Sequence, residues 1–201
     1  MLLTVFPIPV PPAEHDLAPL LPLLPEWRRE QALRFRHTFG QYACAKTWLL
    51  LLDLLARQTR CTLDELRTWP VAYNDYGKPF FPGHPDCCFS ISHCRTALAV
   101  ALDNRPVGVD VEHIRPAEDS LIARTMSSTE QAQIAADPAP ERAFTALWTR
   151  KEAVLKLRGT GIIDDLHNVL TDTTGIHIDT HAHNTYIYSL AQTISNNSKQ
   201  L

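Results

Sequence analysis

Two acidic side chains alternate with valines in residues 107–112, whose sequence is VGVDVE. In a β-strand successive side chains point to opposite faces, so Val109 and Val111 would face a core while Asp110 and Glu112 share the other face. Neighbouring carboxylates repel each other unless a cation lies between them, and Mg²⁺ accepts one or two carboxylates together with substrate phosphates and water. By itself the segment favours an amphipathic strand with a solvated acidic face. It indicates a metal site only in combination with further residues.

A helix expected over residues 143–157 carries a third carboxylate. Trp148, Glu152 and Lys156 are spaced i, i+4, i+8 and therefore share one helix face. A surface Glu–Lys pair would contribute only a few tenths of a kcal/mol. Such a pair does not account for Lys151 and Lys156 flanking a glutamate directly after a tryptophan. This face offers an acid and an ammonium group, and we expect Lys151 to lie beside the same charge.

Four short motifs follow one another along the chain: residues 76–79 (YGKP), 89–93 (FSISH), 108–112 (GVDVE) and 148–156 (WTRKEAVLK). Their order and spacing resemble the signature of the surfactin-type 4′-phosphopantetheinyl transferases. The resemblance covers residues 76–161, and the helical stretch before them fits more loosely. It implies an α+β class with the pseudo-duplicated fold of that family, in which two similar α+β halves enclose the active site. Residues 1–103 would supply the coenzyme A nucleotide contacts, and residues 104–201 would supply the metal site and carrier-protein docking.

The resemblance also implies an activity. The family transfers the 4′-phosphopantetheine arm of coenzyme A to a serine of an apo acyl or peptidyl carrier protein and releases 3′,5′-ADP. Attack of a hydroxyl on a pyrophosphate needs a metal, cations for the leaving charge and a base. Asp110, Glu112 and Glu152 match the Mg²⁺ ligands, and Lys156 matches the residue that contacts the pyrophosphate and stabilises the leaving phosphate. Asp110, Glu152 and Lys156 are therefore the expected catalytic residues, and whether Glu152 acts as base, as metal ligand or as both is left open.

Coenzyme A contacts are implied at four further positions. Ser92 and His93 match residues that touch a coenzyme A phosphate, although a lone histidine commonly just ends a strand in solvent. Lys78 and Pro79 match nucleotide contacts, with Gly77 allowing close backbone approach.

The 3′-phosphate of coenzyme A requires a basic cluster, for which the expected residues are Arg34, Arg36 and Lys46. Here the chain departs from the family pattern, because Gln41 stands where an arginine is frequent and Lys46 stands where an arginine is more typical. A solvated helix face explains the same basic residues equally well. Arg28 and Arg29 are weaker candidates.

Composition excludes several classes of protein. The net charge of −3 over 201 residues does not indicate nucleic-acid binding. The apolar N-terminus lacks a basic segment and contains prolines, so it reads as an edge strand, and the leucine-rich stretch 48–55 is too short to span a bilayer. Five cysteines without a CxxC pair indicate free thiols in a reducing cytoplasm. We therefore expect a cytoplasmic protein without membrane or nucleic-acid partners, and a monomer, since both halves lie on one chain.

Periodicity and turn residues predict the remaining elements. Helices are expected at 41–58 after an interruption at Gly40, at 118–126 and at 129–136. Strands are expected at 88–93 and 96–102, with 107–112 as the central hairpin partner of 96–102. Two or three strands are expected at 167–171, 176–179 and 186–191, and residues 196–201 are expected to be disordered.

Three alternatives remain open at this stage. A magnesium-dependent hydrolase could use the same acids on a nucleotide pyrophosphate without a protein acceptor. A non-catalytic carrier-protein or nucleotide-binding module is a second possibility, although the acids, Lys156 and His93 are all retained. A zinc site at the histidines of residues 176–183 lacks a second ligand group, so surface histidines are favoured there.

The segment after Glu112 is the expected carrier-protein surface. It carries Arg115 and Arg124, together with three apolar residues that are either exposed contacts or the buried stripe of a short helix: Leu121, Ile122 and Met126.

Overall fold

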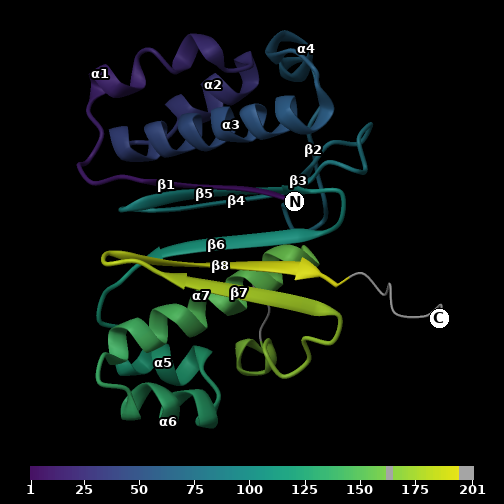
Figure 1. The fold of residues 1–201 in the computed structure, drawn as a ribbon. Coiled ribbons are helices and arrows are strands. Elements are labelled where there is room, and N and C mark those ends of the chain that lie inside the picture. Colours follow the sequence, from purple (N-terminus) through teal and green to yellow (C-terminus); the bar gives the residue numbers. More distant parts are fainter. Residues whose placement is uncertain (162–164, 195–201) are drawn as a thin grey trace, which may run out of the picture.

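The computed structural model describes residues 1–161 and 165–194. Its elements form four layers in Figure 1, with helices outside and two three-stranded sheets between them. The mixed composition of helices and antiparallel strands confirms the α+β class. Within these residues, no helix is both long enough and apolar enough to cross a bilayer.

The first half of the chain builds the upper sheet and its helical cover. Strands β1 (Leu2–Pro7), β5 (Ala97–Asp103) and β4 (Cys88–Cys94) pair antiparallel in the order β1-β5-β4, so β1 is the expected edge strand. The long helix α3 (Thr38–Thr59) buries Trp48, Leu51 and Leu55 in the core against this sheet. The smaller elements are α1 (Glu14–Leu17), η1 (Leu21–Leu23), α2 (Glu26–Leu33), α4 (Leu63–Arg67), β2 (Ala72–Tyr73) and β3 (Pro79–Phe80).

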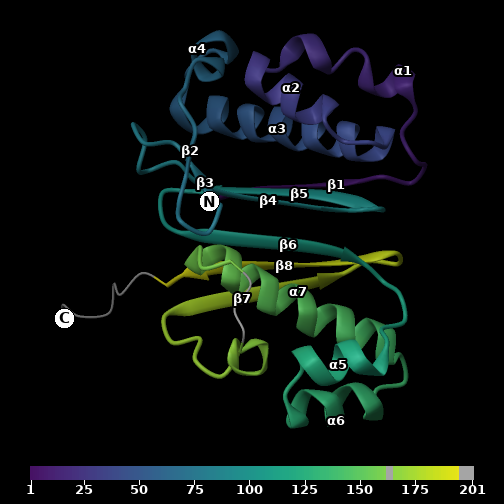
Figure 2. The same ribbon diagram turned by 180° about the vertical axis from the view of Figure 1, so that it is seen from behind.

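The second half builds the lower sheet from β6 (Val107–His113), β8 (Tyr186–Thr193) and β7 (Ile176–Ala182), in the order β6-β8-β7. Helix α7 (Pro140–Arg158) runs along this sheet, as Figure 2 shows from behind. Helices α5 (Asp119–Thr125) and α6 (Ser128–Ala136) and the 3₁₀ turn η2 (Leu166–Asn168) complete the half. Each half thus joins a three-stranded sheet to a long helix, and the chain passes between them after Asp103. Internal duplication of the fold stays a prediction.

The expected β5–β6 hairpin is wrong. Strand β5 is already paired on both edges, with β1 and β4, so the turn after Asp103 carries the chain into the other sheet, where β6 pairs with β8. Strand β6 therefore lies at the edge of its own sheet and is not its central strand.

Three other expectations also need correction or fall outside the structure. Helix α3 begins at Thr38 and includes Gly40, because the absent side chain leaves room for the Phe35 ring, 2.8 Å from where a Cβ would lie. Residues 166–168 form the turn η2, so no strand forms over 167–171. The expectation for residues 196–201 lies outside the described residues.

Two serine hydroxyls link the sheets where β4 passes beside β6. The backbone N–H of Val109 donates to Ser90 Oγ at 3.0 Å, and that of Val111 donates to Ser92 Oγ at 3.2 Å. The side chains of Val109 and Val111 are fully buried between the sheets, as predicted from the alternation. Buried N–H groups need partners, so the hydroxyls replace the carbonyls that a neighbouring strand would supply.

Gly108 determines how closely α7 can approach β6. A Cβ at this position would lie 2.0 Å from the carbonyl oxygen of Ala153 and 2.4 Å from the backbone nitrogen of Leu157. These atoms belong to the helix backbone and cannot move independently. The glycine is therefore required for the docking of the helix that carries Glu152 and Lys156.

Replacing Gly108 with Ala should lower the free energy of unfolding by about 3 kcal/mol, because the added methyl group forces α7 away from the sheet. Urea denaturation of the two proteins would measure the difference. Gly83→Ala is the matched control, since no atom lies within 4 Å of its hypothetical Cβ and its φ lies outside the left-handed region. Equal stability of Gly108→Ala and the wild type would contradict the packing argument.

Candidate active site

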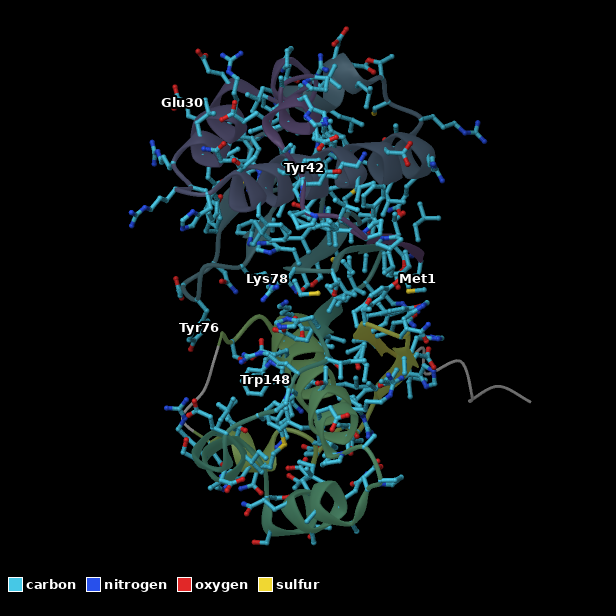
Figure 3. The ribbon with its side chains drawn as sticks, turned by 90° about the vertical axis from the view of Figure 1, so that its left-hand side faces the viewer. Met1, Glu30, Tyr42, Tyr76, Lys78 and Trp148 are labelled. Atoms are coloured by element: carbon cyan, nitrogen blue, oxygen red, sulfur yellow. The ribbon has the colours of Figure 1, made fainter. Side chains whose placement is uncertain are left out.

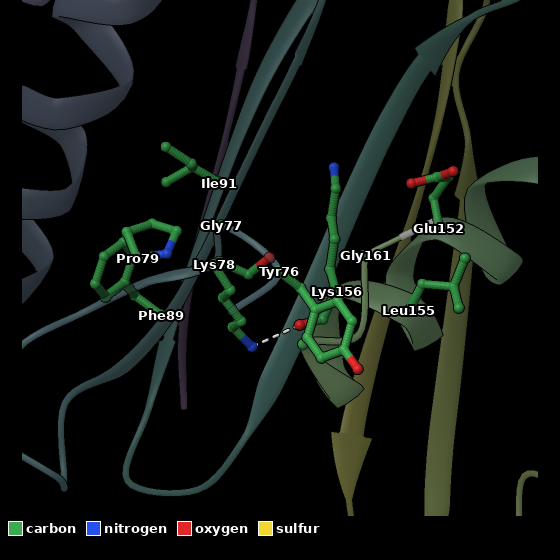
Figure 4. Close-up of a pocket in the computed structure, with 12 residues that line it drawn as sticks. Tyr76, Gly77, Lys78, Pro79, Phe89, Ile91, Glu152, Leu155, Lys156 and Gly161 are labelled. Atoms are coloured by element: carbon green, nitrogen blue, oxygen red, sulfur yellow. Dashed lines mark hydrogen bonds between the residues drawn. The ribbon is translucent and has the colours of Figure 1, made fainter. Parts of the chain in front are cut away.

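Two cavities meet at the side of α7 that faces β4. The first has a volume of about 240 Å³ and lies between residues 76–79, β4 and the C-terminal end of α7 (Figure 4). The second has a volume of about 430 Å³ and is lined from α2, α3, β4, β6 and α7. Ile91, Glu152 and Lys156 line both cavities. A ligand that occupies both cavities would therefore pass Glu152 and Lys156 at the junction.

Asp110, Glu112 and Glu152 all line the second cavity, as their sequence pattern predicts. Asp110 is only 3% exposed, so the premise of a solvated strand carboxylate is wrong for this residue. Its Oδ1 accepts hydrogen bonds from Lys156 Nζ at 2.6 Å and from Ser92 Oγ at 2.8 Å. The carboxylate is therefore part of a buried ion pair that joins β6 to α7.

Burial and neighbouring negative charge raise the affinity of Glu112 and Glu152 for protons. Burial and the charge of Asp110 raise the pKa of Glu112 to about 7, with Lys156 and Arg115 acting in the opposite direction. Burial and the charge of Asp110 also raise the pKa of Glu152. The ammonium of Lys156 therefore only partly offsets the negative charge of the carboxylates, and this excess of negative charge is the electrostatic condition that favours a cation.

The donor set fits a hard divalent cation. Asp110 Oδ2 is buried and has no hydrogen-bond partner among the described residues. It lines the same cavity as Glu112 and Glu152, and carboxylate oxygens are the ligands that Mg²⁺ prefers. No group of three or more His, Cys, Asp or Glu side chains in residues 1–161 and 165–194 is arranged closely enough to hold a metal. The carboxylates are thus gathered on one wall without forming a finished metal centre.

Lys156 extends from α7 into the junction of the cavities. Its side chain is 31% exposed, and besides Asp110 its Nζ contacts Ser92 Oγ at 2.9 Å. Ser92 was expected to touch a phosphate. Its hydroxyl already bonds to Val111 N, Asp110 and Lys156, so in this arrangement it holds the side chains of Asp110 and Lys156 in position.

The opposite wall of the second cavity is cationic. Arg28 is 7% exposed; it donates to Cys44 O at 3.1 Å and lies over the Trp48 ring at 4.8 Å. Its Nε is buried without a partner in the part of the chain that the structure describes. His93 is exposed at the cavity mouth, where partial desolvation lowers its pKa and the charges of Lys156 and Arg28 lower it further. The two residues thus bring a guanidinium and an imidazole to the lining of the same cavity as the carboxylates.

The expected basic cluster does not form this wall. Arg34 and Arg36 are exposed and do not line either cavity, and Lys46 Nζ lies over the Phe6 ring at 4.8 Å. Gln41, the departure from the family pattern, donates from Nε2 to Phe35 O at 2.9 Å and so orders the α2–α3 connection. Arg28 lines the second cavity instead. A signal for it exists in the sequence, since Arg28 and Ala32 are spaced i, i+4 and form the buried face of α2.

The sequence analysis also predicted the wrong surroundings for Lys151, which it placed beside the charge of the Glu152 face. It is fully buried on the far side of α7, where its Nζ donates to Glu130 at 2.6 Å, to Thr125 O at 2.9 Å and to Leu166 O at 2.8 Å. Adjacent helical residues diverge by about 100°, so Lys151 cannot share the face of Glu152. The lysine joins α7 to α6, and no contact connects it with the acidic cluster.

Lys78 and Pro79 line the first cavity, and Lys78 lies on the same side of the molecule as Trp148 in Figure 3. Their role as nucleotide contacts stays a prediction. The histidines of the C-terminal sheet do not converge: His181 stacks on Tyr188 at 4.8 Å and His183 on Tyr186 at 4.5 Å. A zinc site is not formed there among the described residues.

The chain is similar to proteins of one family. A model of the 4′-phosphopantetheinyl transferase superfamily matches residues 106–199. The 4′-phosphopantetheinyl transferase Sfp of Bacillus subtilis is 30% identical over 137 residues, which cover 67% of this chain and 60% of that protein. The transferase psf-1 of Bacillus pumilus is 38% identical over 62% of this chain and 59% of its own length. AcpT of Salmonella typhi is 40% identical over 44% of this chain and 49% of its own length. The matches with the two Bacillus proteins thus span about three fifths of those relatives.

Replacing Glu112 with Gln should stabilise the protein at pH 8 in the presence of EDTA. The folded-state pKa of about 7 lies above the ordinary value of 4.5, so ionisation of Glu112 opposes folding increasingly as the pH rises through this window. We expect a gain of roughly 1–3 kcal/mol at pH 8, reduced from the full shift because the side chain is partly solvated, and no gain at pH 4. Denaturation experiments at both pH values measure this gain in the free energy of unfolding. Glu30→Gln on the outer surface is the control (Figure 3). An equal gain in the free energy of unfolding at pH 4 and pH 8 would contradict the raised pKa of Glu112 in the folded protein.

Proposed function

Since the chain belongs to the 4′-phosphopantetheinyl transferase superfamily, we propose that it transfers the 4′-phosphopantetheine arm of coenzyme A to a serine of an apo acyl or peptidyl carrier protein. The other product is 3′,5′-ADP. We propose further that one chain suffices, because both walls of the site come from the same chain.

The observation that carries this proposal is the junction of two chemically different cavities at Lys156 and Glu152. The first cavity offers apolar surface from Pro79, Phe89 and Leu155, which suits a nucleotide base. The second combines a cationic wall with an acidic one, which suits phosphates together with a metal. A pyrophosphate at the junction would lie beside Lys156, and the acceptor hydroxyl would approach from the open side.

We propose that Asp110, Glu112 and Glu152 hold Mg²⁺. When bound, this ion would neutralise the phosphate charges that repel the attacking oxygen. Lys156 is suited to the charge that develops on the leaving phosphate, because its ammonium is positioned in a partly dry site. The raised pKa of Glu152 brings it closer to neutral pH and makes it a suitable base for the acceptor hydroxyl, directly or through water.

Mass spectrometry of apo carrier proteins incubated with the chain, coenzyme A and Mg²⁺ tests the function directly. Carriers of fatty-acid, polyketide and peptide-synthetase type should be included, because the specificity is unknown. We expect addition of phosphopantetheine to the serine of at least one carrier and formation of 3′,5′-ADP. Cleavage of coenzyme A without a carrier would instead identify a hydrolase, and binding without cleavage would identify a non-catalytic module.

Arg28 rather than the cluster of Arg34, Arg36 and Lys46 is proposed to bind the 3′-phosphate, together with His93. Dephospho-coenzyme A lacks that group and should bind more weakly to the wild type. Arg28→Met should weaken coenzyme A binding about 10- to 100-fold, the value of a charge-assisted contact, while hardly changing the affinity for dephospho-coenzyme A. Calorimetry with both ligands measures the difference.

Arg29→Met is the matched control for this experiment. Arg29 is the neighbouring arginine, does not line either cavity and lies 3.8 Å from Glu26 at the surface. If Arg28→Met lowers the affinity for coenzyme A and for dephospho-coenzyme A equally, the guanidinium serves the packing of Trp48 and does not bind the phosphate.

A third cavity, of about 300 Å³, lies next to the acidic wall and is our proposed docking surface for the carrier protein. Glu112, Arg115, Arg124 and Trp148 are among the residues that line it. Met126 is fully buried, so it is not the exposed contact that the sequence suggested. Leu121 and Ile122 are half-buried and pack against the apolar cluster that contains Met126.

Changing Arg124 to Glu should raise the KM for an acidic carrier protein about tenfold at low salt and leave coenzyme A affinity unchanged, because an exposed charge steers encounter. The effect should shrink as ionic strength rises. Steady-state kinetics at two salt concentrations measure it, with Arg57→Glu on the far side of α3 as control. An unchanged KM at low salt would remove Arg124 from the docking surface.

A further inference from the structure

Lys78 is a nucleotide contact implied by the family resemblance, yet its charged group is already fully used within the protein. Its Nζ donates to three carbonyl oxygens: Lys156 O at 2.5 Å, Val107 O at 3.2 Å and Leu157 O at 3.3 Å. An ammonium group has three hydrogens to donate. The bond to Lys156 is drawn in Figure 4. In this arrangement the ammonium has no hydrogen left for a nucleotide.

The carbonyls that Lys78 contacts have a special place in the fold. Those of Lys156 and Leu157 belong to the last turn of α7, whose carbonyl groups have no partners within the helix. A positive charge at this end is also favoured by the helix dipole. The carbonyl of Val107 belongs to the first residue of β6. One side chain from the first half of the molecule therefore holds the end of the catalytic helix against the start of the acidic strand.

Asn74 supports the same end of α7 by a second contact. Its Nδ2 donates to the carbonyl oxygen of Gly159 at 2.8 Å, while its Oδ1 accepts from the backbone nitrogens of Tyr76 and Lys78 at 3.0 and 2.8 Å. The turn is thus rigid before it meets the helix. Gly159 permits the close approach: a Cβ there would lie 3.1 Å from Asn74 Nδ2 and 3.2 Å from Lys78 Cδ.

Lys156 is consequently held at both ends. Its backbone carbonyl is bound by Lys78, and its Nζ is bound by Asp110 and Ser92. A helix end that was free to fray would release the first of these restraints. Burial lowers the pKa of the Lys78 ammonium, as expected for a cation that contacts neutral carbonyls.

We propose that Lys78 and Asn74 are positioning residues that cap α7 across the junction of the two halves and thereby hold Lys156 in register with the acidic strand. This inference rests on the proposed transferase function. It predicts that Lys78 affects the rate of the reaction and not the affinity for coenzyme A. A direct nucleotide contact would have the opposite kinetic signature.

The test compares Lys78→Met, which keeps the stem and removes the donors, with Asn74→Asp, which keeps the acceptor of the turn and removes the donor to Gly159. Lys78→Arg retains donors and serves as the conservative variant. Arg57→Met is the control, because Arg57 pairs only with Asp53 on the outer face of α3. Coenzyme A affinity is measured by calorimetry, and kcat is measured with an apo carrier protein that the wild type modifies.

We expect kcat to fall about 10- to 100-fold in Lys78→Met and less in Asn74→Asp, because a small displacement of a catalytic group is costly. Coenzyme A affinity should change by less than about threefold, and Lys78→Arg should recover part of kcat. Loss of affinity at unchanged kcat would overturn the proposal and return Lys78 to the nucleotide site.

Hydrogen exchange supplies a readout that does not depend on activity. Amides of residues 155–160 should exchange at least tenfold faster in Lys78→Met than in the wild type or in Arg57→Met. Unchanged exchange would overturn the cap whether or not the chain is a transferase. If the wild-type chain modified no carrier protein, the proposed function would be rejected. The exchange rates would still show whether Lys78 caps α7.

Discussion

Two serine hydroxyls are the connection on which the rest of the site depends. Strand β6 pairs with β8 on one edge only, and its other edge presents buried N–H groups that would each cost about 1–3 kcal/mol if unsatisfied. Ser90 and Ser92 satisfy two of them and so fix β4 beside β6. Because Ser92 also bonds to Asp110 and Lys156, the contact that joins the sheets also orders these two side chains of the candidate site.

Helix α7 is positioned by three kinds of interaction on different sides of the helix. The absence of a side chain at Gly108 sets the distance between helix and strand, and the buried pair of Lys151 and Glu130 anchors the opposite face. The Asp110–Lys156 pair closes the side that faces the cavity. A buried pair of this kind contributes little net stability but is costly to break, so it gives position more than strength. Burial and the neighbouring negative charge of Asp110 raise the pKa of Glu112 in the same site.

Local chemistry explains which features were predictable from the sequence. The alternation of Val109 and Val111 with the two acids, and the i, i+4 spacing of Glu152 and Lys156, each describe a face of one element, and both faces are as expected. The failures involve partners that are distant in sequence. Pairing of β6 with β8 depends on β5 being already paired on both edges. Arg34 and Arg28 belong to one short stretch, and only the packing of α2 decides that Arg28 faces the cavity.

By itself the sequence determined the α+β class and the family, because motif spacing and periodicity are properties of the chain alone. Tertiary structure decided where the ammonium group of each lysine lies. Three lysines lie in motifs that match the family. Lys151 is buried against Glu130, Lys156 reaches the junction of the cavities, and Lys78 binds carbonyls at the end of α7. The reason is physical. A lysine stem is long and flexible, so the place of its ammonium depends on which acceptors the folded chain brings within reach.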